Sequence, residues 1–305
     1  MATETYHTPA LLAETLDLLH LNPSGVYVDA TFGGGGHSRA ILERLGPEGR
    51  LFGFDRDIDA LANVPDDPRF TFVHSDYRFI PNFLQYHGVE RVDGILADQG
   101  VSFHHFDSGE RGFSFREDAP LDMRMNRRGG RSAADIVADS SAEELTRIFR
   151  TYSDLKKPGL IAAAIVKARS LKPVDTTFRL AEAITPVLNP KSLKKDLAQA
   201  FQALRIETNN ELRSLSDLLT NSLSILKPEG RLAIITYHSI EDRMVKNFMR
   251  SGNIEGEVRQ DIYGRILTPW TLITRSPVTP SPEEVERNPR SRSAKLRVAE
   301  LSMTE

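Results

Sequence analysis

The sequence predicts an α/β protein in which a parallel β-sheet is interrupted once by an inserted α-helical segment. Short apolar runs alternate with amphipathic stretches over the first hundred residues. Residues 99–228 then show helical periodicity without a convincing strand, and strand character returns afterwards. Alternating strands and helices are typical of βαβ units, whose parallel strands need helices over both faces of the sheet.

Four segments of the first hundred residues have the length and composition of strands. They are 26–30 (VYVDA), 51–55 (LFGFD), 70–74 (FTFVH) and 93–98 (DGILAD). Helix-length segments lie between them, at 38–45, 57–64 and 80–87. In the first of these, Ile41, Leu42 and Leu45 have helical spacing, so each strand is expected to be followed by a helix.

The inserted segment begins with a loop rich in glycine and arginine that ends at Gly130. Ser140 and Ser141 then precede Glu143 and Glu144 at capping-box spacing, which predicts a helix start. Further helical periodicity covers 160–171, 178–184, 197–206 and 211–226. We therefore expect an inserted helical domain at 106–211 and a discontinuous sheet domain at 1–105 and 212–305.

Strand character resumes at 231–238 (RLAIITYH), followed by a helical segment at 240–250 and strand candidates at 266–274 and 295–301. Ser239 and Asp242 stand three residues apart at the start of that helix. This spacing predicts that Ser239 caps the helix and that Asp242 interacts with its dipole.

Composition excludes several classes of protein. The chain has 305 residues, 40% hydrophobic and 27% charged, which is typical of a globular protein. Its longest apolar stretch, 159–166, is far shorter than the roughly 20 residues of a membrane span. The N-terminus lacks the pattern of a signal peptide, so we expect a cytoplasmic protein without membrane association. The absence of cysteine excludes disulfides, thiolate metal sites and a cysteine nucleophile.

The net charge of −3 does not indicate a polyanionic partner, but two local runs of positive charge do. Residues 124–131 contain Arg124, Arg127, Arg128 and Arg131 and no acid, and residues 287–297 contain five basic residues and no acid. Such runs can contact the phosphates of a nucleic acid. A solvated surface loop is the alternative for each run.

A run of four glycines, 33–36, follows the first predicted strand and precedes a helix. Glycine there lets the backbone approach a ligand closely. The run does not fit GxGxxG, because Ser38 or Arg39 occupies the last glycine position, so a pyrophosphate cradle is disfavoured. The architecture suits a nucleoside whose charged part is an amino acid, as in S-adenosylmethionine. Asp55, at the end of the second strand, is placed to accept hydrogen bonds from ribose hydroxyls.

Asp98 ends the fourth predicted strand, so it is expected in the same crevice as Asp55. The adjacent His104 and His105 lack a spaced partner such as HExxH, so no metal site is expected. His238, Ser239 and Asp242 stand too close in sequence for a catalytic triad, and GxSxG is absent.

Eight sequence blocks resemble, in order and over nearly the whole chain, the RsmH family of methyltransferases, also called MraW. They are HTPALLAE (7–14), DATFGGGGHS (29–38), FDRD (54–57), ERGFSF (110–115), PLDMRM (120–125), FQALRI (201–206), HSIEDR (238–243) and NPRSRSAKLR (288–297). The resemblance implies a class I, Rossmann-like methyltransferase sheet with an inserted helical domain that helps bind RNA. It also implies methyl transfer from S-adenosylmethionine to N4 of a cytosine in small-subunit (16S) ribosomal RNA near the decoding centre. The implied partner is that RNA or the assembled small subunit, and a homodimer is a further expectation.

The resemblance also assigns site residues. Cofactor contacts are implied at Gly35, Gly36, His37, Asp55, Tyr77, Asp98 and His105. The family usually reads DLGVSSPQLD after the fourth strand, whereas this chain reads DQGVSFHHFD, so that Gln99, Phe103, His104 and His105 differ from it.

Asp98 is our candidate acceptor for the hydrogen bonds and the proton of the cytosine amine. Two alternatives remain open at this point. One is a weakened relative that binds ribosomal RNA without methylating it, and the other is a nicotinamide-dependent dehydrogenase.

Overall fold

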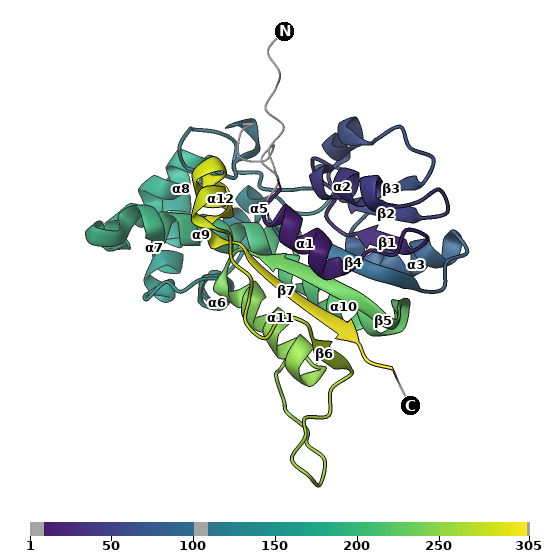
Figure 1. The fold of residues 1–305 in the computed structure, drawn as a ribbon. Helices are drawn as coiled ribbons and strands as arrows, with labels where there is room; N and C mark the ends of the chain where they lie inside the picture. Colours follow the sequence, from purple (N-terminus) through teal and green to yellow (C-terminus); the bar gives the residue numbers. More distant parts are fainter. Residues whose placement is uncertain (1–8, 101–108, 304–305) are drawn as a thin grey trace. The chain divides into compact units, whose positions relative to one another are not determined.

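The computed structural model describes residues 9–100 and 109–303. The chain divides into two compact units, of which unit 1 comprises Met1–Gly100 and Arg213–Glu305, and unit 2 comprises Val101–Leu212. Unit 1 contains a β-sheet covered by helices, and the regular elements of unit 2 are helices (Figure 1). The predicted fold class, an α/β sheet interrupted by a helical insert, is therefore confirmed.

Unit 1 is built on a seven-stranded sheet in the order β3-β2-β1-β4-β5-β7-β6 (Figure 1). Its strands are β1 (Val26–Asp29), β2 (Arg50–Asp55), β3 (Phe70–His74), β4 (Val92–Asp98), β5 (Leu226–Thr236), β6 (Trp270–Leu272) and β7 (Lys295–Leu301). The first five in this order are parallel, and β7 runs antiparallel to both β5 and β6. The order reverses at β1 and β4, the position where open α/β sheets bind ligands at the carboxyl ends of their strands.

Helices cover both faces of this sheet, as its parallel strands require. One face packs against α3 (Ile80–Tyr86), α10 (Glu211–Ile225) and α11 (Ser239–Ser251). The other packs against α1 (Leu12–Leu19) and α2 (Gly36–Arg44). Successive residues of one strand alternate between the two cores, for example Ile95 and Leu96 of β4, because side chains along a strand point to opposite faces.

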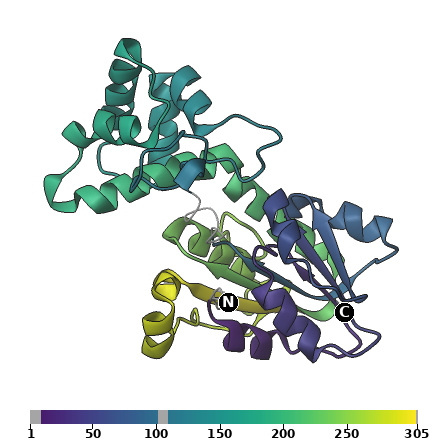
Figure 2. The same ribbon diagram turned by 90° about the horizontal axis from the view of Figure 1, so that it is seen from above.

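The regular secondary structure of unit 2, within its described residues, is helical apart from an isolated bridge between Pro120 and Thr176 (Figure 2). Its helices are α5 (Ala133–Asp139), α6 (Ala142–Tyr152), α7 (Pro158–Leu171), α8 (Thr177–Ile184) and α9 (Leu193–Asn209), with short 3-10 turns η3 (Gly109–Arg111), η4 (Thr185–Val187) and η5 (Pro190–Ser192). They enclose a hydrophobic core of their own, from Phe113 to Leu204. The predicted capping box is present at Ser141 and Glu144.

Some predicted elements differ from the observed ones. The helix expected at 57–64 is the 3-10 helix η1 (Ile58–Asn63), which Pro65 keeps short because the residue before a proline avoids helical geometry. Strand β5 begins five residues earlier than predicted, at Leu226, and β6 is only three residues long. The remaining short elements are η2 (Tyr77–Phe79), α12 (Pro282–Arg287) and η6 (Pro289–Ser293).

The predicted cap of α11 is wrong by one residue. His238 is the N-cap, and its Nδ1 accepts a hydrogen bond of 3.4 Å from the Glu241 N–H. Ser239 is already the first helical residue. The predicted dipole residue, Asp242, is in the first turn, but its carboxylate pairs with Arg297 at 2.7 Å.

None of the helices in the described residues is both long enough and apolar enough to cross a membrane.

Candidate active site

Acidic side chains gather at the carboxyl ends of the parallel strands. Asp29, Asp55 and Asp98 end β1, β2 and β4, which are neighbours in the sheet. The Asp98 N–H donates to the Thr31 hydroxyl at 2.6 Å, which ties the end of β4 to the loop after β1. The strand ends therefore bring together acids that are far apart in sequence.

The glycine loop lies directly after β1 and leads into α2. Gly35 has a positive φ of 72°, and a Cβ there would lie 2.9 Å from the Phe32 ring, so only glycine fits. At Gly34 a Cβ would meet none of the described atoms within 4 Å, so the backbone is open to a ligand on that side. Because α2 begins at Gly36, the first N–H groups of the helix have no partner within the helix.

Asp55 holds the glycine loop in place. Its Oδ2 accepts a hydrogen bond from the Gly33 N–H and its Oδ1 accepts one from the Asp57 N–H, both at 2.8 Å. Each carboxylate oxygen has two lone pairs, so these bonds leave acceptor capacity for a ligand.

His37 and Asp29 form a buried pair beside the loop. The carboxylate of Asp29 accepts from the Ser38 hydroxyl at 2.7 Å and from the Thr31 N–H at 3.1 Å. Burial lowers the pKa of His37, so its ring is neutral at pH 7. The ring hydrogen-bonds the backbone of Ala10, and its Nε2 has no partner among the described residues.

Tyr77 follows β3, in η2, and its ring is buried. Its hydroxyl donates to Oε1 of Gln99 at 2.9 Å, which joins the end of β3 to the end of β4. The preceding residue, Asp76, pairs with Arg56 at 3.1 Å and accepts from the Ser214 hydroxyl at 2.9 Å. Sequence reasoning missed Asp76. It follows the predicted strand 70–74 closely, much as Asp55 ends β2, and this position could have identified it as a candidate site residue.

Burial raises the pKa of two carboxyl groups of the site, Asp29 and Asp98. Burial and, to a smaller extent, the negative charge of Glu241 raise the pKa of Asp98 to about 6, although hydrogen bonds from the Gly100 N–H and the Tyr237 hydroxyl lower it. The Tyr237 ring packs so closely that a Cβ on Gly100 would lie 2.9 Å from it. A carboxyl with a pKa near neutrality in a ligand crevice is a candidate proton acceptor.

Glu241 is a second buried acid near Asp98, with 1% of its surface exposed. Its Oε1 lies 2.9 Å from Nε2 of His238, and its Oε2 accepts from the Tyr237 N–H at 3.2 Å. This burial could not be predicted from the sequence, since an acid in the first turn of a helix is normally exposed.

A model of the MraW methylase family matches residues 4–302. This chain belongs to the MraW methylase family. Its relatives include Ribosomal RNA small subunit methyltransferase H of Parabacteroides distasonis, 55% identical over 296 residues, which are 97% of each chain. The protein of the same name from Bacteroides thetaiotaomicron is 54% identical over 296 residues, and the one from Flavobacterium johnsoniae is 50% identical over 298. They match 97% and 98% of this chain, respectively, and the same shares of their own chains.

One departure from the usual MraW sequence can be located. Gln99 replaces the usual leucine and receives the Tyr77 hydrogen bond, while its Nε2 is buried with no partner in the described part of the chain. The other departures, Phe103, His104 and His105, lie outside the described residues. Within residues 9–100 and 109–303 there is no cluster of side chains that could hold a metal ion.

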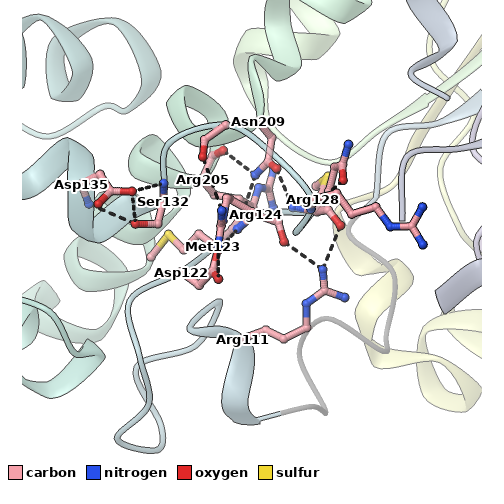
Figure 3. Close-up of polar contacts among 12 residues, drawn as sticks. Arg111, Asp122, Met123, Arg124, Arg128, Ser132, Asp135, Arg205 and Asn209 are labelled. Carbon is pink, nitrogen blue, oxygen red and sulfur yellow. Dashed lines mark hydrogen bonds and ion pairs between the residues drawn. The ribbon is translucent and has the colours of Figure 1, made fainter. Parts of the chain in front are cut away.

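The arginines predicted to contact RNA differ in their surroundings within unit 2, and Figure 3 shows two of them, Arg124 and Arg128. Arg124 is engaged by both carboxylate oxygens of Asp122, at 2.7 and 2.9 Å. Arg131 lies 3.5 Å from Asp139 in an exposed pair. Arg127 and Arg128 are exposed.

The second basic run is partly neutralised inside unit 1. Lys295 and Arg297, both on β7, pair with Asp242 at 3.3 and 2.7 Å. The sequence of the basic run could not predict this pairing, because the acid, Asp242, lies on α11, far from residues 287–297 along the chain.

Proposed function

We propose that this chain transfers a methyl group from S-adenosylmethionine to N4 of a cytosine in small-subunit ribosomal RNA. The observation that carries the proposal is the match to proteins named ribosomal RNA small subunit methyltransferase H over 97% of the chain. The acids at the strand ends support it, because they stand where a class I sheet binds its cofactor.

The residues around the glycine loop fit such a cofactor. Asp55 has the capacity to bind the ribose hydroxyls, and Gly35 and Gly36 allow close approach to the start of α2. The orphan Nε2 of neutral His37 is suited to an ammonium group, because its ring donates from one nitrogen and accepts at the other. Tyr77 would lie beside the adenine.

When bound, S-adenosylmethionine supplies a methyl group already activated on a sulfonium, so positioning is the main task of the protein. The cytosine amine is the weaker partner, because its lone pair is delocalised into the ring. Asp98 would accept hydrogen bonds from this amine and then its proton. The raised pKa of Asp98 supports this role, since an effective base has a pKa near the working pH.

We assign RNA binding to the inserted domain, 106–211, and to its arginine run. A ribosomal RNA substrate would place the protein in the cytoplasm. We further propose that the substrate is this RNA, either free or within the assembled small subunit, and that the protein forms a homodimer. Sedimentation in solution would test the homodimer.

The proposal is tested with radiolabelled S-adenosylmethionine and two substrates, purified 16S RNA and small subunits from cells that lack this gene. After incubation, the RNA is digested to nucleosides and analysed by mass spectrometry. We expect N4-methylcytidine in at least one reaction, and on the order of 10² less of it at equal time with the Asp98→Asn variant.

Three results would contradict the proposal. A different methylated nucleoside would change the target atom. RNA binding without methyl incorporation would identify the weakened relative. Binding of NAD in place of S-adenosylmethionine would favour the dehydrogenase.

A further inference from the structure

The loop that carries the arginine run is held in one conformation by buried side chains of unit 2 (Figure 3). Asn209, at the end of α9, donates to the Met123 carbonyl and accepts from the Met125 N–H, both at 2.8 Å. Arg111 donates to the carbonyls of Arg124 and Met125 at 2.8 and 3.0 Å. Asn209 and Arg111 are 8% and 4% exposed, so these bonds are at least partly buried.

The held backbone includes a strained residue. Met123 has a φ of +57°, a left-handed conformation that costs a bulky residue on the order of 1 kcal/mol or more. Its side chain is fully buried. Strain of this kind persists only where the surroundings fix it, so Asn209 and Arg111 determine the shape of the loop.

The arginines of the loop divide into two kinds. The charge of Arg124 is neutralised by Asp122, whose pKa is held below its usual range by this guanidinium. Arg124 therefore stabilises the loop through its ion pair with Asp122, and its charge is not available to a phosphate. At the tip, the Asn126 side chain accepts from the Arg128 N–H at 3.0 Å and forms a turn. Arg127 and Arg128 are exposed there, and Arg127 also interacts electrostatically with Asp122.

We propose that Arg127 and Arg128 form a preformed phosphate-binding tip for RNA, positioned by Asn209 and Arg111. Two adjacent exposed guanidinium groups can each contact a phosphate of a nucleic-acid backbone, and Gly129 and Gly130 beside them leave room for its approach. Preorganisation lowers the entropy lost on binding. This inference rests on the proposed function, because it specifies how the same RNA is held.

The test measures binding of the full-length protein to purified 16S RNA over a series of salt concentrations. For Arg127→Ala/Arg128→Ala, loss of two phosphate contacts should reduce the slope of log K against log salt by about 1.4 to 1.8. Affinity at 0.1 M salt should fall by about tenfold or more, with S-adenosylmethionine affinity unchanged. The control is Arg150→Ala/Lys156→Ala, which removes two exposed charges elsewhere in unit 2 and should retain the slope.

Asn209 is tested as a positioning residue by a double-mutant cycle. Asn209→Ala alone should weaken RNA binding without removing charge, and it should have little further effect in the Arg127→Ala/Arg128→Ala background. An equal further loss in that background would show that Asn209 acts through general folding, which would overturn its positioning role.

The outcomes separate the two proposals. If the parent protein methylates and binds 16S RNA while Arg127→Ala/Arg128→Ala binds with the same slope, only the tip is wrong. If the parent protein neither binds nor methylates the RNA, whether purified or within the small subunit, the proposed function and the tip are both overturned. If Arg150→Ala/Lys156→Ala lowers the slope of log K against log salt as much as Arg127→Ala/Arg128→Ala does, binding depends on total charge and the tip is not a specific phosphate site.

Discussion

At the scale of single residues, Asp98 combines a proposed catalytic role with a cost to the stability of the fold. It ends the strand next to the switch point of the sheet, and burial raises its pKa to about 6. The same low-polarity surroundings that make the carboxylate a better base also make its charge unfavourable.

Asp98→Asn keeps the shape of the side chain and removes its capacity to take a proton. If Asp98 accepts the proton of the amine, turnover at saturating S-adenosylmethionine should fall by on the order of 10² or more. The parent rate should also decline below about pH 6, as the carboxyl becomes protonated. A variant with normal saturated turnover and a raised Michaelis constant would show that Asp98 only orients the cofactor.

At alkaline pH, Asp98→Asn should have a larger free energy of unfolding than the parent protein. The pKa of Asp98 is about 6 in the folded protein and about 3.9 in the unfolded chain, so between these values the folded state binds more protons. Stability is therefore lost as pH rises through this window, by up to about 3 kcal/mol. Urea unfolding without cofactor should show Asp98→Asn gaining stability over the parent protein between pH 4 and pH 8. The exposed Asp139→Asn should show no such gain.

Asp55→Ala should weaken S-adenosylmethionine binding by roughly 1 to 3 kcal/mol, because ribose hydroxyls would lose a charged acceptor and the Gly33 N–H would lose its partner. Calorimetry measures the change, with the exposed Asp66→Ala as a matched control. Unchanged affinity would remove Asp55 from the site.

Residues at the ends of strands could be located from sequence, because an acid after an apolar run must lie at the carboxyl edge of a parallel sheet. Asp55 and Asp98 were found in this way. The burial of Glu241 and the bond between Tyr77 and Gln99 could not be, because each depends on contacts between segments distant in sequence.

At the scale of secondary-structure elements, the sequence predicted helix starts best where nearby side chains form the hydrogen bonds of the first backbone N–H groups. The capping box of α6 is complete: the Ser141 hydroxyl accepts from the Glu144 N–H at 3.1 Å, and the Glu144 carboxylate accepts from the Ser141 N–H at 2.7 Å. The start of α11 was misplaced because a histidine, an uncommon capping residue, performs the role expected of Ser239.

Ser141→Ala should destabilise unit 2 by about 1 kcal/mol, since the Glu144 N–H would lose its partner. Hydrogen exchange followed by mass spectrometry should show faster exchange in α6 and its neighbours, with little change in the strands of unit 1. Ser170→Ala, which removes an exposed hydroxyl bonded within α7, should leave exchange unchanged. Equal effects of both variants would argue against the cap.

At the scale of the whole molecule, the two units differ in how the chain builds their cores. The core of unit 2 comes from one continuous stretch, from Phe113 to Leu204. The cores of unit 1 combine residues from before and after it, so that Ile95 of β4 shares a cluster with Leu232 of β5. The change in periodicity along the sequence indicated the interruption, but not which helices cover which face.

This difference predicts how fragments behave. A fragment of residues 101–212 should fold alone, with a helical circular-dichroism spectrum and a cooperative thermal transition, because it contains its entire core. A fragment of residues 1–100 should not, because it lacks β5, which pairs with β4, and the helices α10 and α11, which cover one face of the sheet. Burial of that face supplies much of the free energy that offsets chain entropy. Coexpression of 1–100 with 213–305 should restore a cooperative transition, because both halves of the split core are then present. Cooperative unfolding of 1–100 alone would show that the sheet does not depend on the returning strands.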